Sequence, residues 1–346
     1  MNGTRGPGEA PLRSLQMSTS VDAPQALPST RGTRDRFGDR ALVLLTVGAS
    51  LAVVVALGLI IEQVASGSAP SVSRFGLGFL WHSTWNPTLS AGAVGENVYG
   101  AGALVYGTLV VALISLVIAV PLGVAIGVFL GVIAPRRVSA VIGPLVELLA
   151  AIPSVILGLW GIVVLAPILS STVEPALHGA LGFIPSFGQP SQTGLGLFTA
   201  GIVVAIMVVP IIASITRDLF MAVPSELKDG ALALGATQWE MIRGVVLGST
   251  GAGIGAATVL GLSRALGEAI ATTQLVGTGS TVTSNLFANG DTLASRIAEQ
   301  FIGAVSKLQT ASLFYAALVL LVMEIAVNLV AQLIVRRSRS AQGLAT

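Results

Sequence analysis

Residues 217–250 read RDLFMAVPSELKDGALALGATQWEMIRGVVLGST, and this charged stretch between apolar ones decides how the chain folds. Pro224 and Ser225 predict the start of a helix, because serine is favoured at helix N-termini. Glu226 adds negative charge to the first turn, where the helix dipole is positive. The helix is expected to run through ELKDGALAL and to end at Gly235.

A second short helix is predicted directly after that glycine. Thr237 can cap its N-terminus, and Glu240 stands at the spacing of a capping box. The whole stretch therefore predicts a helix, a glycine and a second helix that lie across the surface of a membrane.

The composition is that of a membrane protein. Of the 346 residues, 53% are hydrophobic and 10% are charged, and the mean hydropathy is +0.86. Soluble domains carry about 25% charged residues, so we expect an all-α polytopic membrane protein. Cysteine is absent, which excludes disulfides and thiolate metal sites. His82 and His178 lie far apart in the sequence and do not indicate a zinc site, so no metal is expected.

Six apolar stretches are long enough to cross the hydrocarbon core, which takes roughly 20 residues of helix. They cover residues 41–61, 104–131, 140–169, 197–216, 252–276 and 311–335. Residues 1–40 are rich in Gly, Pro, Ser, Thr and Arg and are expected to form a disordered tail. The first stretch is predicted to be an uncleaved anchor, with a cleaved signal peptide as the alternative. Residues 62–100 are expected to form an external loop, and residues 101–335 a core with the other five helices.

The basic residues predict which way the chain crosses the membrane. Fourteen of the 18 lie in the N-terminal tail, after the second and fourth stretches, and in the C-terminal tail 336–346. Arg74, Arg296 and Lys307 lie on the opposite side. Because cytoplasmic loops carry the excess of Lys and Arg, both termini are expected to face the cytoplasm.

Glycines and prolines inside the apolar stretches predict how the helices pack. Gly123, Gly127 and Gly131 stand four apart, a spacing that lets helix backbones approach closely. Pro121 is expected to kink the second helix. Pro153 is expected to bend the third helix, either as a static kink or as part of a gate.

The opening stretch resembles the cytoplasmic coupling loop of ABC-importer permeases, the EAA loop. That loop has Glu-Ala-Ala, a glycine four residues later and a Leu-Pro further on, and the same positions here read Asp-Gly-Ala, Gly and Leu-Gly. The resemblance implies a type I, MetI-like permease of six helices, whose short helix inserts into a groove of an ATPase. It assigns ATPase coupling to Glu226, Asp229, Gly230, Ala231 and Gly235. The alternative is an ordinary helix at the membrane surface.

The motor itself is expected in another chain. A Walker A loop requires GxxxxGK[ST], but Lys228 is followed by Asp and Lys307 by Leu. We therefore expect that this chain is not an enzyme and binds no cofactor, and that ATP and Mg²⁺ are used by a partner ATPase.

Several further stretches resemble the permeases of phosphate importers, and in particular the PstC type. They are STWNP (83–87), LVYGTLVVALISLVIAVPLGVAIGVFL (104–130), LLAAIPSVILGLWGIVVLAP (148–167) and GLSRALGEAIA (261–271). Residues 1–40 have no counterpart in that family. The resemblance implies a complex in a bacterial inner membrane. Its other parts would be a PstA-like second permease, two copies of an ATP-binding subunit and an extracytoplasmic phosphate-binding protein.

Arg264 and Glu268 place two charges in the fifth apolar stretch. A charge at the bilayer centre costs about 2.5–3.5 kcal/mol on insertion scales, so such residues pair with each other or face a cavity. The guanidinium of Arg264 suits phosphate oxygens. Glu268, predicted one turn away on the same helix face, can accept a hydrogen bond from protonated phosphate. Two alternatives remain, a pair that lines the substrate pathway and a salt bridge that only holds the helix.

Other polar residues stand inside the predicted helices. Glu147 either lines the inner mouth of the pore or extends to the membrane surface. Glu324, Asn328 and Gln332 recur every four residues and form one polar stripe. The stripe is expected to make hydrogen bonds to helices of the partner permease, with substrate contact as the alternative.

Three other functions compete with phosphate import. A permease of the same architecture could carry another oxyanion or nutrient. A secondary transporter or channel would need no ATPase, but such folds often show inverted repeats, and no internal repeat is evident. An intramembrane enzyme ranks last, because neither GxSxG nor HExxH occurs.

Overall fold

The structure is a computed structural model, and it describes residue 3 and residues 33–87, 99–279 and 281–341. The predicted all-α class is confirmed, since these residues are mostly helical and hold no named strand. In these ranges, six helices are long and apolar enough to cross a membrane. The chain divides into two compact units, residues 1–58 and 59–346.

The first unit holds the N-terminal part of helix α1 (Thr33–Phe75), which continues into the second unit. Large apolar side chains such as Leu44 and Val53 are exposed along it. A helix that is apolar all round suits lipid rather than water. Residues 33–40 of the predicted tail are helical, and residues 4–32 lie outside the described residues. The helix also continues beyond its predicted end at residue 61.

The core of the second unit is formed by α2 (Gly102–Val128) and α7 (Leu197–Met221), which run side by side in the same direction. Their backbones approach closely at glycines. A Cβ at Gly123 would lie 2.8 Å from Ile212 Cβ, and a Cβ at Gly127 would collide with Thr216. The close packing predicted from the glycine spacing is confirmed, and it is made within the chain. Pro121 lies inside α2 without ending it.

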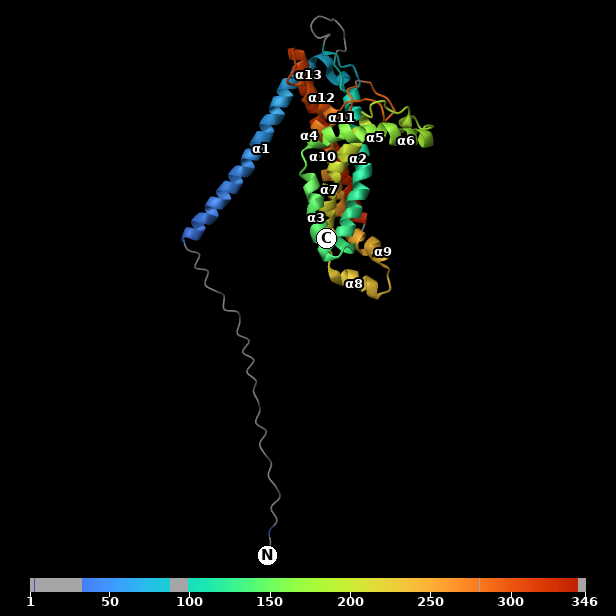
Figure 1. The fold of residues 1–346 in the computed structure, drawn as a ribbon. Coiled ribbons are helices and arrows are strands. Elements are labelled where there is room, and N and C mark those ends of the chain that lie inside the picture. The colour runs from blue at the N-terminus through green and yellow to red at the C-terminus, as the bar shows by residue number, and fades with distance from the viewer. Residues whose placement is uncertain (1–2, 4–32, 88–98, 280, 342–346) are drawn as a thin grey trace. The chain divides into compact units, whose positions relative to one another are not determined.

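The remaining helices occupy both ends and the sides of this pair. They are α3 (Arg136–Ala150), α4 (Ser154–Trp160), α5 (Ala166–Ile168), α6 (Glu174–Leu181), α8 (Ser225–Ala233), α9 (Gln238–Met241), α10 (Leu247–Leu266), α11 (Ile270–Leu275), α12 (Leu293–Gln300) and α13 (Lys307–Ala341). Short 3₁₀ or π-helical turns cover Gly76–Leu80, Phe129–Ile133, Gly161–Leu165, Leu169–Val173, Pro185–Phe187 and Ile242–Val246. Figure 1 shows α8 and α9 at one end of the second unit and α11 and α12 toward the other.

The predicted third helix is broken rather than bent. α3 ends at Ala150, and α4 begins at Ser154 with Pro153 as its N-cap in an extended conformation (φ −58°, ψ 136°). Proline has no N–H to donate and disfavours a helical backbone at the residue before it, so the helix stops there. From Ser154 the chain stays helical to Leu181, and Figure 1 shows α4, α5 and α6 at a steep angle to α2 and α7.

The predicted fifth helix is also interrupted. The helix that begins at Gln238 ends at Leu266, and the next three residues leave the helix before α11 starts. Glu268 therefore does not lie one turn from Arg264 on the same helix, and that expectation is wrong. The interruption is stabilised locally, because the Oε1 atom of Glu268 accepts the backbone N–H of Ala271 at 3.1 Å. This bond satisfies one of the free N–H groups at the start of α11.

The stretch quoted first folds as predicted. α8 begins at Ser225. Thr237 and Glu240 form the capping box: Glu240 N donates to Thr237 Oγ1 at 3.2 Å, and Thr237 N donates to Glu240 Oε2 at 2.8 Å. Between the two helices, Gly235 has φ +91°, a backbone conformation that residues with a side chain rarely adopt.

Candidate functional site

Arg264 and Glu268 form an ion pair across the break in the fifth helix. Arg264 lies in the last turn of α10, and Glu268 lies in the turn that follows. The Nη2 atom of Arg264 is 3.1 Å from the Oε2 atom of Glu268. The side chain of Glu268 is 3% exposed, whereas that of Arg264 is 46% exposed. The carboxylate is therefore buried behind a guanidinium that remains accessible.

Both oxygens of Glu268 have partners. Oε2 faces Arg264, while Oε1 accepts the N–H of Ala271 in the first turn of α11. Each oxygen of this buried carboxylate therefore has a partner that donates to it. Within the described ranges, Arg264 has no second acidic partner. Since a guanidinium has five N–H donors, Arg264 can contact a further anion while Glu268 holds it in place.

The polar stripe of α13 faces α10 of the same chain. Asn328 Oδ1 accepts a hydrogen bond from Ser263 Oγ at 3.0 Å. One turn away, Glu324 Oε1 lies 3.2 Å from the position that a Cβ at Gly267 would take. The stripe thus contacts Ser263 and Gly267, and the hydrogen bond of Asn328 is made within this chain, where a bond to the partner permease was expected.

Glu147 is paired with Arg217 of α7, with 2.9 Å between Oε1 and Nη2. The same Nη2 atom lies 3.0 Å from Asp218 Oδ1. The guanidinium fits closely against α3, because a Cβ at Gly143 would lie 2.5 Å from Nη1. These three side chains line a cavity of about 620 Å³. Glu147 therefore links α3 to the last turns of α7.

The predicted coupling residues lie on and beside α8. Four of them are exposed, namely Glu226, Asp229, Gly230 and Gly235. Ala231 instead packs against the core around Phe220, and Lys228 Nζ donates to the carbonyl of Phe220 at 2.9 Å. These two contacts fix α8 to the last turn of α7.

Large apolar side chains remain exposed around α8. They are Leu227, Leu232, Leu234 and Trp239, and we call them the coupling surface. Leu234 is 91% exposed, so nearly all of its apolar side chain is accessible to solvent in the isolated chain. A group of exposed apolar side chains at one end of a protein is typical of a contact with another protein.

A buried ion pair at the N-terminal end of α12 was not predicted from the sequence. Arg296 Nη2 lies 2.5 Å from Asp291 Oδ2, and the side chains are 6% and 2% exposed. Asp291 Oδ1 accepts hydrogen bonds from Thr292 N, at 2.8 Å, and from Ser295 Oγ. The guanidinium carbon of Arg296 lies 5.7 Å from the ring centre of Trp85. The available signal was the capping box of Thr292 and Ser295, which starts α12 and places Arg296 in its first turns.

A family model described as the binding-protein-dependent transport system inner membrane component matches residues 123–340. The matched range contains the Arg264–Glu268 pair, the polar stripe of α13 and the coupling surface.

Curated relatives match nearly the whole chain. The phosphate transport system permease protein PstC of Mesorhizobium japonicum is 39% identical over 329 residues, which cover 92% of this chain and 98% of that protein. PstC of Xylella fastidiosa is 36% identical, with 94% of this chain and 99% of that protein covered. The probable phosphate transport system permease protein PstC of Methanocaldococcus jannaschii is 32% identical, with 86% and 93% covered.

A solved structure has a similar fold. A chain of a bacterial alginate ABC transporter, in complex with an alginate pentasaccharide-bound periplasmic protein, matches with a TM-score of 0.58. The match covers 88% of this chain and 96% of that chain at 16% identity. At this identity the likeness shows the fold alone.

Proposed function

The chain belongs to the family of binding-protein-dependent transport system inner membrane components, with PstC-type permeases as its relatives, and on that premise we propose that it forms half of the pore of an ATP-driven phosphate importer. It is a multi-pass membrane protein, with six helices able to span a membrane in the described ranges. We place it in the inner membrane of a bacterium, with both termini in the cytoplasm.

The accessible guanidinium of Arg264 is the observation that supports an anion as substrate. Phosphate carries between one and two negative charges at neutral pH and needs several donors when it leaves water. Arg264 offers them on a side chain that is 46% exposed and is held by a buried carboxylate. In the structure each oxygen of the Glu268 carboxylate has a partner. A protonated phosphate oxygen would reach it once the pair opens, which would favour phosphate over sulfate.

The complex needs further subunits in this proposal. A PstA-like permease would supply the other half of the pore, and an extracytoplasmic phosphate-binding protein would deliver the anion. Two copies of an ATP-binding subunit would dock below, one of them on the coupling surface. ATP and Mg²⁺ would be used there, since the chain has no Walker A loop and would bind no cofactor.

Phosphate uptake in a strain that lacks its own phosphate permease tests the proposal. The chain is expressed with its partner subunits, and uptake of radiolabelled phosphate is competed with arsenate, sulfate and molybdate. We expect arsenate to compete, because it shares the protonation of phosphate, and sulfate and molybdate to compete weakly. Sulfate competing as well as phosphate would instead favour a permease for another oxyanion. Uptake that persists when the ATPase lysine of the Walker A loop is replaced would favour a secondary transporter.

Replacing Gly235 with valine is expected to weaken ATPase docking. A β-branched residue at φ +91° is strained by about 1–3 kcal/mol, so the turn between α8 and α9 should shift. The measurement is the amount of ATPase subunit that co-purifies with the permease, together with phosphate uptake.

Gly244→Val is the matched control for this variant, because Gly244 is not one of the predicted coupling residues. Both glycines are exposed, and an added Cβ meets nothing within 4 Å at either position, but only Gly235 has a positive φ. We expect Gly244→Val to co-purify the ATPase normally. Unchanged docking and uptake in Gly235→Val would count against the assignment of α8 as the coupling helix.

A further inference from the structure

α10 and α13 pack in an antiparallel register that brings the polar stripe against small residues. Ser263 contacts Asn328, and a Cβ at Gly255 would lie 2.5 Å from Val335 Cγ2. The N-terminal part of α10 therefore packs beside the C-terminal part of α13. Gln332 lies between Asn328 and Val335 on α13, so it faces the stretch of α10 that precedes Ser263.

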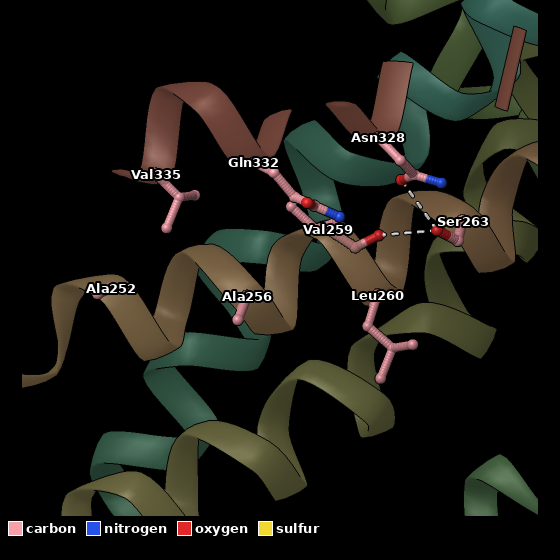
Figure 2. Close-up of a pocket in the computed structure, with 8 residues that line it drawn as sticks. All are labelled: Ala252, Ala256, Val259, Leu260, Ser263, Asn328, Gln332 and Val335. Carbon is pink, nitrogen blue, oxygen red and sulfur yellow. Dashed lines mark hydrogen bonds between the residues drawn. The ribbon is translucent and has the colours of Figure 1, made fainter. Parts of the chain in front are cut away.

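A cavity of about 430 Å³ lies along this seam, as Figure 2 shows. Its polar lining consists of Ser263, Asn328 and Gln332, and Ala252 and Ala256 belong to its apolar lining. No described residue in this lining is charged. Glu324 lies one turn beyond Asn328 and does not line the cavity.

The lining of the cavity on α10 begins one residue before Arg264, at Ser263. Arg264 directly follows Ser263 in α10, and the lining continues back along α10 as far as Ala252. Eleven residues of helix correspond to about 16 Å at the usual rise per residue. In Figure 1 this part of α10 leads toward the end of the unit where α8 and α9 lie. The cavity thus connects the level of Arg264 with the end that carries the coupling surface.

The donors along this connection are neutral. The oxygen of Asn328 is used by Ser263, which leaves the amide N–H groups of Asn328 free for an anion, and Gln332 offers another amide. Hydrogen bonds from neutral donors are about half as strong as those from a charged one. An ion moves through a pore only if each site holds it weakly enough to release it. A guanidinium followed by amides is therefore suited to passing an anion onward rather than trapping it.

We propose that the cavity between α10 and α13 is the inner segment of the anion route, in which the amides of Asn328 and Gln332 receive a tetrahedral oxyanion after it leaves Arg264. This inference rests on the proposed function. It gives the polar stripe two roles, since Asn328 both joins the helices and faces the cavity.

Cysteine accessibility tests the inference, because the chain has no cysteine of its own. Ala256→Cys and Gln332→Cys place a thiol in the cavity. Leu329→Cys and Leu333→Cys place one on the same region of α13 at side chains that are 54% and 56% exposed and do not line the cavity. Each variant is assembled with its partner subunits, themselves cysteine-free, in membrane vesicles. The probe is the anionic reagent 2-sulfonatoethyl methanethiosulfonate, and inorganic phosphate with ATP is the protecting condition.

We expect the cavity thiols to react at least about tenfold faster than the controls, because a thiol must reach water to ionise and react. Turnover with phosphate should slow that reaction. Two different positions guard against a variant that fails to assemble, and the amount of partner subunits that co-purifies with each variant shows that it has assembled. Cavity thiols that are unreactive, or whose reaction phosphate leaves unchanged, would overturn the inference. The inference would also be overturned if the second permease by itself, without phosphate, protected the cavity thiols from the reagent, because the cavity would then be an interface between subunits.

The same vesicles separate this inference from the proposed function. If they import phosphate but phosphate fails to protect the cavity thiols, the route is wrong and phosphate import stands. If they import sulfate instead and sulfate protects the thiols, the proposed substrate is wrong and the oxyanion route stands.

Discussion

The Arg264→Gln variant is expected to import phosphate about ten- to a hundredfold more slowly than the unmodified chain, because a hydrogen bond to a charged group contributes about 1.5–3 kcal/mol and each 1.4 kcal/mol is tenfold. The accessible guanidinium is the cation that the anion would meet, and glutamine offers neither its charge nor its planar fork. Initial rates of radiolabelled phosphate uptake measure the effect. The amount of complex in the membrane is measured on the same cells.

A double variant separates the two interpretations of the pair. Removing Arg264 alone leaves Glu268 buried opposite an uncharged group, which is costly in itself. Glu268→Gln removes that charge and can still accept the N–H of Ala271. If the pair lines the pathway, the Arg264→Gln/Glu268→Gln variant assembles well and remains inactive. Recovery of uptake in the double variant, or normal uptake in Arg264→Gln, would show that the pair is only structural.

Arg296→Met is expected to have the largest effect on stability. Removing one partner of a buried ion pair typically costs about 3–5 kcal/mol, because the other charge remains buried without compensation. Asp291 would keep its hydrogen bonds from Thr292 and Ser295 but lose its counter-ion. We expect a lower midpoint of thermal unfolding for the detergent-solubilised complex and less complex in the membrane.

Two controls make this expectation specific. Arg137→Met removes an exposed arginine from α3 and should leave the unfolding midpoint unchanged. Asp291→Asn combined with Arg296→Met removes both charges and should recover much of the lost stability. An unfolding midpoint of Arg296→Met equal to that of Arg137→Met would contradict the assignment of a buried, stabilising pair.

The parts of the fold that follow from local chemistry could be predicted from the sequence. The capping box of Thr237 and Glu240 needs only residues that are three apart, and the glycine contacts of α2 need only a spacing of four. The apolar stretches were found because a membrane-spanning helix must satisfy its own backbone and expose apolar side chains.

The breaks in two helices could not be found in this way. Average hydropathy does not change over a three-residue turn inside an apolar run. The break after α10 is stabilised by the carboxylate of Glu268, whose burial depends on packing that the sequence does not display. Pro153 gave a signal at the other break, but a proline alone does not distinguish a kink from a new helix.

The pairing of Arg264 with Glu268 could be predicted from the sequence, but its geometry could not. Arg264 and Glu268 are paired, but on either side of a helix end. Arg296 was counted as a loop charge, because the positive-inside rule counts charges and does not consider burial. Its partner Asp291 is five residues earlier, outside the helical spacing at which ion pairs are usually sought.

The side chain of Glu268 links the ion pair with Arg264 to the N-terminus of α11. One oxygen holds Arg264 and the other caps α11, so anything that draws this side chain outward also removes the cap from α11. α11 in turn packs closely against α4, where a Cβ at Gly158 would lie 3.2 Å from the Cα of Ala271. A cargo that competed with Glu268 for the guanidinium would therefore also weaken the N-terminal cap of α11, beside the contact of α11 with α4.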